Sequence, residues 1–208
     1  MVSGAGEDID AAKTAVRAEV LAARRLLTPE ALAAAASGIR DRALEALAPA
    51  PTVALYASTG SEPGTHPLLE AFRAADVRVL LPVLLPDNSL DWAAYRGPDF
   101  LVPGRLGTVE PAGPKLGPEA IGDALLVFVP GLAADPAGHR LGRGGGSYDR
   151  ALRFAHPAAL VAVVLHVGEL IPSVPVRGHD QEVHAVLTME GLIPVGAPQQ
   201  QDDVGEAW

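Results

Sequence analysis

The run DALLVFVPGL, residues 123–132, is the most apolar stretch of the chain and decides the predicted fold. A short run rich in Val, Leu and Phe that ends at Pro and Gly predicts a buried central strand. Further predicted strands are the β-prone runs at residues 52–58, 77–85, 90–96, 159–167 and 182–190. Pro82 lies inside the second of these runs, which predicts either an edge position or a break in that strand.

Predicted helices alternate with these strands. In residues 11–27, the apolar spacing of Val16, Val20, Leu21 and Leu27 predicts an amphipathic helix, whose polar side is supplied by Lys13, Arg17, Arg24 and Arg25. A second helix begins after an N-cap at Thr28, with Pro29 in its first turn, and continues to about Leu47. A third runs from Thr65 to about Ala75. This alternation predicts an α/β fold, a three-layer α/β/α sandwich with a mainly parallel central sheet.

Composition limits the class of protein. The 208 residues contain 49% hydrophobic residues and no internal repeat, so we expect one domain over residues 1–197 and a polar, disordered tail over residues 198–208. The chain has no cysteine, which excludes disulfides and thiolate sites. The acidic start MVSGAGEDID is unlike a secretory signal, and no apolar run reaches the roughly 18 to 20 residues that span a bilayer. We therefore expect a cytoplasmic protein without a membrane partner, and a monomer.

Three loops are expected to form one pocket. In α/β folds, ligands bind where loops leave the carboxyl ends of parallel strands. The loops in question are TGSEPGT (residues 59–65), PGLAADPAGHRLGRGGG (residues 130–146) and IPSVPVRGHD (residues 171–180). A net charge of −9 argues against a nucleic acid as the ligand, because phosphate backbones are bound through an excess of Lys and Arg.

The stretch RLGRGGGSYDRAL, residues 140–152, has the composition of an anion cradle. It matches neither the dinucleotide fingerprint nor a P-loop, because Ser147 replaces the sixth-position glycine and no Lys follows the glycines. Glycines still let backbone amides approach an anion, and Arg140, Arg143 and Arg150 add charge. Asp149 would repel phosphates unless a divalent cation lies between them. The residues alone leave two interpretations open: a metal–nucleotide site, or a surface turn with solvated arginines.

The longer stretch VPGLAADPAGHRLGRGGGSYDRAL, residues 129–152, resembles the signature of the 5-formyltetrahydrofolate cyclo-ligase family, also called methenyltetrahydrofolate synthetases. Other segments occur in the family's order and extend the resemblance from Lys13 to Gly191: the basic pair Lys13 and Arg17, ALYASTGSEPGT, LP at 81–82, GTVEP at 107–111 and HD at 179–180. The resemblance implies an ATP- and Mg²⁺-dependent enzyme that cyclises 5-formyltetrahydrofolate to 5,10-methenyltetrahydrofolate through a phosphorylated formyl group, with release of ADP and phosphate.

The resemblance also assigns roles to residues. It implies ATP contacts from Lys13, Arg17, Arg140, Leu141, Gly142, Arg143, Gly144, Gly145, Gly146, Ser147 and Tyr148. Substrate contacts are implied for Ala57, Glu62, Arg143, Gly144, Gly145, Gly146 and Ser147, with Glu62 bound to the pterin. Asp149 and Asp180 match the family's Mg²⁺ positions, and Arg143 and Asp149 are the implied catalytic residues.

Each of these residues also has a plain structural interpretation. Lys13 and Arg17 can solvate a helix, Glu62 can lie in an exposed turn, and Asp180 can pair with Arg177 or cap a strand end. Glu110 and Pro111 are assigned to loop structure. The six histidines lack metal-ligand spacing and are assigned structural or surface roles, with His179 set apart by its place beside Asp180.

The chain departs from the family's pattern at two positions. Family members usually carry Tyr at the position of Ser147 and often an aromatic residue at Leu106. Loss of either ring would remove pterin stacking of about 0.5–1.5 kcal/mol. Two alternatives to the enzyme therefore stay open: an ATP-binding regulatory or accessory protein that has lost folate chemistry, and a sugar-phosphate or CoA-ester enzyme that shares only the scaffold.

Overall fold

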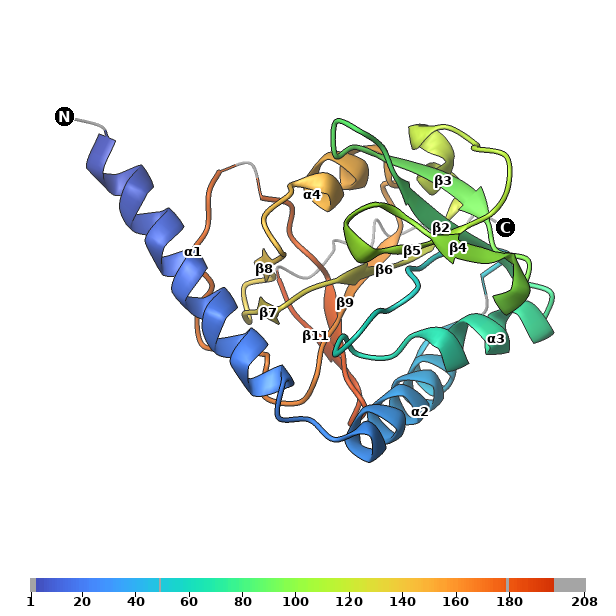
Figure 1. Cartoon of the computed structure of the whole chain (residues 1–208), viewed down its shortest axis with the longest axis horizontal. Helices are drawn as coiled ribbons and strands as arrows, with labels where there is room; N and C mark the ends of the chain where they lie inside the picture. The colour runs from blue at the N-terminus through green and yellow to red at the C-terminus, as the bar shows by residue number, and fades with distance from the viewer. Residues whose placement is uncertain (1–2, 49, 179, 197–208) are drawn as a thin grey trace, which may run out of the picture.

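The computed structural model describes residues 3–48, 50–178 and 180–196 (Figure 1). The tail predicted for residues 198–208 and the residue His179 lie outside the described part. Within it, a seven-stranded sheet has the order β11-β10-β9-β6-β1-β2-β3. Its strands are β1 (Thr52–Ala54), β2 (Arg78–Leu84), β3 (Leu90–Ala94), β6 (Leu126–Pro130), β9 (Leu160–Val164), β10 (Ala185–Leu187) and β11 (Leu192–Pro194).

The sheet is mainly parallel, as predicted. All pairings from β10 across to β2 are parallel, and only the outer strands β11 and β3 run antiparallel to their neighbours. Strand β6, from the apolar run at 123–132, has three strands on either side. It is buried on both faces, which explains why its sequence is apolar without alternation.

Several strands are shorter than their apolar runs. Strand β1 uses three residues of the predicted 52–58, because the chain after Ala54 leaves the sheet and enters a loop. Strand β2 continues through Pro82 without a break. Its parallel pairing with β1 ends at Leu80, so Pro82 faces only Trp92 of β3. Both alternatives are therefore wrong, because β2 is unbroken and lies between β1 and β3. Pro82 is tolerated because it lies beyond the segment of β2 that pairs with β1.

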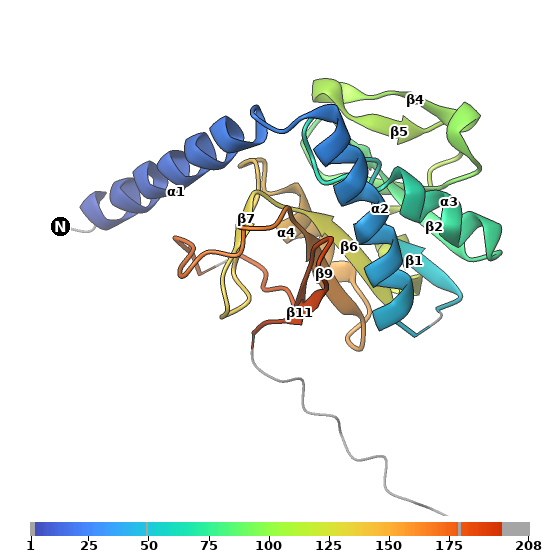
Figure 2. The same ribbon diagram turned by 90° about the horizontal axis from the view of Figure 1, so that it is seen from below.

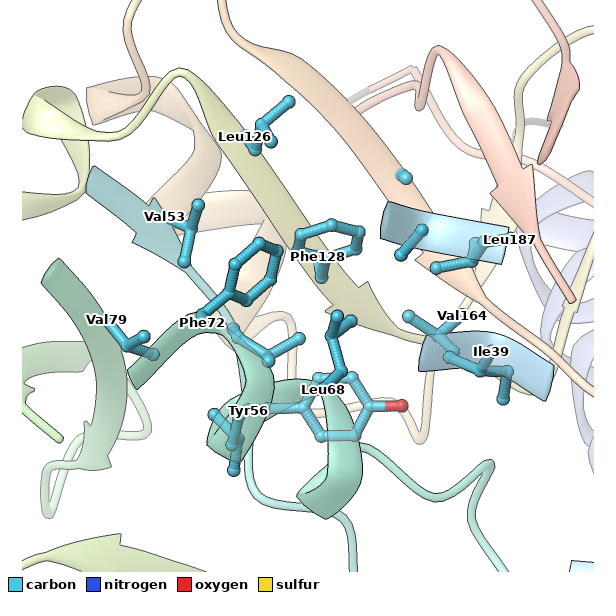
Figure 3. Close-up of a cluster of buried hydrophobic side chains, with 14 of the residues drawn as sticks. Ile39, Val53, Tyr56, Leu68, Phe72, Val79, Leu126, Phe128, Val164 and Leu187 are labelled. Carbon is cyan, nitrogen blue, oxygen red and sulfur yellow. The ribbon is translucent and has the colours of Figure 1, made fainter. Parts of the chain in front are cut away.

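Helices α2 (Pro29–Ala46) and α3 (His66–Ala74) cover one face of the sheet. Figure 3 shows the apolar cluster beneath them, where the rings of Phe72 and Phe128 lie 6.0 Å apart. Thr28 caps α2 as predicted, because its hydroxyl accepts a hydrogen bond from the Ala31 amide at 3.2 Å. The opposite face is covered by short elements: η3 (Pro118–Asp123), α4 (Ser147–Ala151) and η4 (Leu152–Phe154). The three-layer sandwich is confirmed, with one thin helical layer.

Two small hairpins lie outside the main sheet. Strands β4 (Leu101–Pro103) and β5 (Val109–Pro111) form one, with η1 (Pro98–Phe100) before it and η2 (Arg105–Gly107) at its tip. Strands β7 (Ala133–Ala134) and β8 (Arg140–Leu141) form the other. The second hairpin carries the chain from the end of β6 to the glycine-rich loop.

Helix α1 (Ser3–Arg24) does not cover a face of the sheet. It lies against loops, and Figure 2 shows its N-terminal part extending away from the layers. The predicted polar side of Lys13, Arg17, Arg24 and Arg25 is wrong for two of its members, because Lys13 is 8% and Arg24 2% exposed. Arg17 is half-buried, and Arg25 is exposed as predicted. The helix meets carbonyl and carboxylate oxygens at the carboxyl ends of the strands, so Lys13 and Arg24 pack inward. No helix in the described ranges is long and apolar enough to cross a membrane.

Candidate active site

The central crevice of the sheet opens between β1 and β6. From β1 the chain adds β2 and β3 on one side, and from β6 it adds β9 and β10 on the other. Such a reversal of strand order leaves a crevice at the carboxyl ends, where doubly wound folds bind their ligands. A cavity of about 470 Å³ lies there, bounded by Tyr56 and Ala57 after β1 and by Pro130 and Gly131 at the end of β6.

The cavity brings together every site residue predicted from the sequence. Its lining includes Lys13, Arg17, Ala57, Glu62, Asp180 and all residues from Arg140 to Asp149. These residues come from four separate segments, and the three predicted loops all contribute. The convergence favours a binding site over unrelated surface turns.

The glycine-rich loop turns sharply after β8. Gly144 and Gly146 have φ values of 105° and 64°, conformations in which a side chain would be strained. Gly146 is the N-cap of α4, and no side chain caps that end. Helix α4, which follows the loop, is only five residues long. The loop's backbone amides therefore line the cavity without bulky side chains between them.

Arg140 is the buried cation of this loop. Its Nη1 donates to the Pro130 carbonyl at 3.1 Å and its Nη2 to Asp149 Oδ1 at 2.9 Å. The guanidinium also lies 5.9 Å from the centre of the Tyr148 ring. Burial raises the pKa of the Tyr148 phenol, although Arg140 opposes the rise, so this hydroxyl stays protonated at neutral pH.

Helix α1 supplies the opposite wall. Lys13 Nζ donates to Asp180 Oδ2 at 2.6 Å, and Arg17 Nε donates to the Gly142 carbonyl at 2.9 Å. Asp180 also accepts from the backbone amide of Arg177 at 2.8 Å. Both basic residues are thus joined to loops of the cavity rather than merely solvated, and the pairing predicted for Asp180 with Arg177 occurs through the backbone.

Asp135 joins two of the three predicted loops. Its buried carboxylate accepts hydrogen bonds from the amides of Ala137, His139 and Val174 and lies 3.0 Å from the His139 ring. Burial works against ionisation here, but the bonds from Val174 and His139 hold the pKa of Asp135 below its usual range. The carboxylate therefore stays charged and ties the loop before the glycines to the loop that carries Asp180.

Glu62 and Arg143 meet from opposite sides of the cavity. Glu62 Oε2 accepts from the Thr59 amide at 2.8 Å, and Oε1 lies 3.1 Å from Arg143 Nη2. The Glu62 side chain is only 14% exposed, whereas that of Arg143 is 62% exposed. The prediction of an exposed turn residue at Glu62 is therefore wrong, and its carboxylate is held in place at the cavity wall.

The two predicted metal ligands lie close to each other. The amide of Gln181, the residue after Asp180, donates to Asp149 Oδ1 at 3.3 Å. Each carboxylate is paired with a cation, and the described residues contain no group of three or more His, Asp or Glu that could hold a metal ion alone. Two carboxylates fit Mg²⁺ when phosphate and water oxygens complete its shell.

Charges around the cavity balance. Five basic and five acidic side chains line it: Lys13, Arg17, Arg140, Arg143 and Arg177, and Asp10, Glu62, Glu110, Asp149 and Asp180. A bound triphosphate would leave this lining with an excess of negative charge. A divalent cation shared by the phosphates and the carboxylates would offset that excess.

Sequence reasoning missed some residues of the lining. Tyr56 lies at the cavity with its hydroxyl buried and without a hydrogen-bond partner in the described part of the chain, and burial raises its pKa. The predicted strand 52–58 contains Tyr56, so the sequence offered no signal that places it at the cavity. Glu110 also lines the cavity, and its Oε1 accepts from the Leu84 amide at 3.1 Å and the Thr108 hydroxyl at 2.9 Å. Its assignment to loop structure is wrong, because Glu110 and Pro111 lie in strand β5.

Comparisons with known proteins agree with the resemblance. The model of the 5-formyltetrahydrofolate cyclo-ligase family matches residues 9–189. The 5-formyltetrahydrofolate cyclo-ligase of Mycolicibacterium smegmatis is 43% identical over 142 residues, which are 66% of this chain and 73% of that protein. The cyclo-ligase of Escherichia coli strain K12 is 33% identical over 170 residues, 79% of this chain and 93% of that protein.

Solved structures support the same relationship. An NMR structure of Aquifex aeolicus 5,10-methenyltetrahydrofolate synthetase superposes with a TM-score of 0.72 and 25% identity, covering 94% of this chain and 95% of the other. A synthetase structure from Mycoplasma pneumoniae has a TM-score of 0.68 at 18% identity over 86% of this chain and 99% of the other, which shows the shared fold. The chain therefore belongs to the 5-formyltetrahydrofolate cyclo-ligase family and is an enzyme of that ligase class.

Proposed function

We propose that the protein converts 5-formyltetrahydrofolate and ATP to 5,10-methenyltetrahydrofolate, ADP and phosphate, with Mg²⁺ as the metal. The observation that carries the proposal is the meeting, around one cavity, of the glycine-rich loop, the α1 cations and the carboxylates of Glu62, Asp149 and Asp180. The reaction needs a nucleotide site next to an acidic group that binds the pterin. The residues that line this cavity support the presence of both.

The formyl oxygen is a poor leaving group, and the proposed chemistry activates it by phosphorylation. The formyl oxygen on N5 attacks the γ-phosphorus of ATP, and the bond from that phosphorus to the bridging oxygen breaks to release ADP. N10 then attacks the activated carbon and loses its proton, and the carbon–oxygen bond breaks to release phosphate. Positioning and charge neutralisation suffice for both steps, because the protein forms no covalent bond.

The residues of the chain would divide this work. Lys13, Arg17 and the amides of the loop from Gly142 to Ser147 would hold the triphosphate. Arg143, the most exposed of the loop's cavity cations, is placed to move from Glu62 onto the transferred phosphoryl group. Glu62, held by the Thr59 amide, would accept hydrogen bonds from the pterin and fix its orientation.

Asp149 and Asp180 would hold Mg²⁺. When bound, the ion would supply positive charge that offsets the negative charge developing as the phosphoryl group moves. The chain's part is to hold both carboxylates close together, and Arg140 and Lys13 fix their positions through ion pairs. These pairs must loosen or share their carboxylate oxygens when the ion binds.

The two departures from the family pattern lie at the same cavity. Leu106 is 83% exposed at the tip of the β4–β5 hairpin, and Ser147 begins α4. Neither offers a ring to stack on the pterin. This observation supports a second candidate, an accessory protein that binds ATP and has lost folate chemistry.

One assay separates the two candidates. The protein is mixed with Mg²⁺, ATP and 5-formyltetrahydrofolate at neutral pH, and the near-ultraviolet absorbance of the conjugated methenyl product is followed together with ADP release. The proposed enzyme forms the chromophore and ADP in equal amounts. ADP without the chromophore supports the accessory protein. Absence of both, with no heat on titration of Mg²⁺ and ATP, contradicts both candidates.

A further inference from the structure

Arg24, at the C-terminal end of α1, makes a buried ion pair with Glu169. Neither residue has a role in the proposed reaction. Arg24 Nε donates to Glu169 Oε1 at 2.6 Å and its Nη2 to Glu169 Oε2 at 2.7 Å, a two-point geometry that fixes direction as well as distance. The side chains of Arg24 and Glu169 are 2% and 9% exposed. Neither residue lines the cavity around the glycine-rich loop.

Glu169 is itself held rigidly. Its Oε2 accepts from the His166 amide at 2.8 Å, its own amide donates to the His166 carbonyl at 3.2 Å, and its carbonyl accepts from the Ala134 amide at 3.1 Å. The residue therefore sits in a closed turn after β9 that is bonded to β7. A carboxylate fixed in this way is a firm anchor for a helix.

Arg24 also reaches the wall of the cavity. Its Nη2 donates to the carbonyl of Gly131 at 2.8 Å, while Arg140 donates to the carbonyl of the preceding residue, Pro130, at 3.1 Å. A Cβ on Gly131 would lie 2.5 Å from Val163 Cγ2, so the chain approaches β9 this closely only with glycine there. Two successive carbonyls at the end of β6 thus bind one arginine from α1 and one from the glycine-rich loop.

Besides the bonds from Lys13 to Asp180 and from Arg17 to the Gly142 carbonyl, the other contacts of α1 are weaker anchors. Its Val16 is the one α1 residue that joins the small apolar cluster of Ala133, Leu141 and Val174. The pair formed by Asp10 and Arg177 is 63% and 38% exposed, and exposed pairs contribute little. Lys13 and Arg17 lie about three and about two turns before Arg24 on the same stripe of the helix. The orientation of that stripe depends on what holds the C-terminal end.

We propose that Arg24 and Glu169 are positioning residues. They fix the position and the rotation of α1 at the end of β6, so that Lys13 and Arg17 face the nucleotide part of the cavity. The inference rests on the proposed function for its kinetic readout, since it assigns Lys13 and Arg17 to ATP. Arg24 itself touches neither substrate.

The test replaces both charges at once, with Arg24→Met and Glu169→Gln in one chain. Methionine keeps much of the apolar stem, and glutamine keeps an acceptor for the His166 amide, so no lone buried charge remains. We expect KM for ATP to rise about tenfold while KM for 5-formyltetrahydrofolate stays within about twofold. A simple loss of folded protein would lower the apparent kcat and leave both constants unchanged.

Two further chains complete the design. Arg24→Lys keeps the charge but loses the two-point geometry, and we expect an intermediate rise in KM for ATP. The control is Arg78→Met with Asp123→Asn, which removes an exposed ion pair between β2 and η3 that is likewise distant in sequence. We expect both Michaelis constants of the control to stay at wild-type values.

Amide hydrogen exchange gives a second readout that does not depend on activity. Most of the stability of a protein helix comes from tertiary packing, so loosening α1 should speed exchange at residues 8–22 about tenfold or more relative to β6. If the wild-type chain makes no product, the proposed function is wrong. Amide hydrogen exchange alone then tests whether Arg24 and Glu169 hold α1 in place.

Several results would overturn the positioning role. These are wild-type KM for ATP in a folded double variant, an equal rise in both Michaelis constants, or an α1 that is as protected in the variant as in the wild type. If the double variant does not fold, Arg24→Lys decides: a raised KM for ATP supports the role, and a wild-type value refutes it.

Discussion

Asp149 is an acidic residue of the cavity whose side chain is held by two hydrogen bonds. Its Oδ1 accepts from both Arg140 and the Gln181 amide, so the carboxylate is fixed between the glycine-rich loop and the segment that carries Asp180. In its proposed role as a Mg²⁺ ligand, Asp149 would act mainly on the charge that develops as the phosphoryl group moves, because binding of the neutral pterin needs no charge at this point.

Replacement of Asp149 by Asn should therefore affect turnover more than binding. We expect kcat to fall about 100-fold with folate affinity within about twofold of wild type, as measured by steady-state kinetics and by calorimetry with folate alone. Asp123→Asn, at an exposed carboxylate outside the cavity, serves as the control. Unchanged turnover with weakened folate binding would contradict the assigned role.

Glu62→Gln should weaken folate binding more than it lowers turnover. The amide can still accept a hydrogen bond from Thr59, but it lacks the charge for strong bonds with the pterin, so KM for folate should rise about tenfold. Glu70→Gln is a matched control, because Glu70 is also paired with an arginine, Arg73, and lies outside the cavity lining. A wild-type KM for folate in the Glu62 variant would remove the residue from the binding site.

At the scale of elements, the glycine-rich loop depends on backbone conformations that only glycine adopts easily. Gly146 has φ of 64° at the start of α4, where its conformation directs the loop's amides. A Cβ there would lie 3.1 Å from Arg150 Nη1, the end of a flexible side chain, so the cost comes from the backbone more than from a clash.

Gly146→Ala should thus distort the loop without unfolding the protein. The expected strain is about 1–2 kcal/mol, seen as a lower Tm together with a loss of ATP affinity in calorimetry. Gly97→Ala is the control, since Gly97 also has a positive φ, of 124°, and lies outside the cavity lining. It should lower Tm and leave ATP affinity intact. Equal affinity in both variants would show that the loop amides do not bind the nucleotide.

At the scale of the whole molecule, the cavity joins parts that are otherwise separate. Helix α1, the two halves of the sheet and the β4–β5 hairpin all contribute to its lining. A ligand that binds across them stabilises the native state as a unit, because it binds the assembled cavity and not the unfolded chain.

Mg²⁺ and ATP together should raise Tm. At a ligand concentration of 100 times Kd the stabilisation is about 2.7 kcal/mol, which corresponds to roughly 5–10 °C for a domain of this size. The measurement is a thermal melt with ATP in the presence of Mg²⁺ or of EDTA. Because the basic and acidic side chains of the lining balance, no cation offsets the triphosphate charge when EDTA is present. We therefore expect ATP to raise Tm much less with EDTA than with Mg²⁺. Equal shifts in both conditions would argue against Asp149 and Asp180 as metal ligands.

The amino-acid sequence by itself determined the features that depend on near neighbours in the chain. The apolar run that contains β6, the cap at Thr28, the bounds of α2 and α3 and the loop at 142–146 were predicted correctly, whereas residues 140–141 of the predicted loop form β8. Each is set by local conformational preference or by burial of one continuous segment, so its pattern is visible without the rest of the molecule.

Only the tertiary structure decided which side of α1 faces the protein. Lys13 pairs with Asp180 across 167 residues and Arg24 with Glu169 across 145, and helical periodicity carries no information about such partners. A basic side chain favours solvent until a fixed oxygen ligand replaces its water, and those oxygens are supplied by loops at the ends of β6 and β9. The same dependence on distant segments placed Tyr56 and Glu110 at the cavity and shortened β1 to three residues.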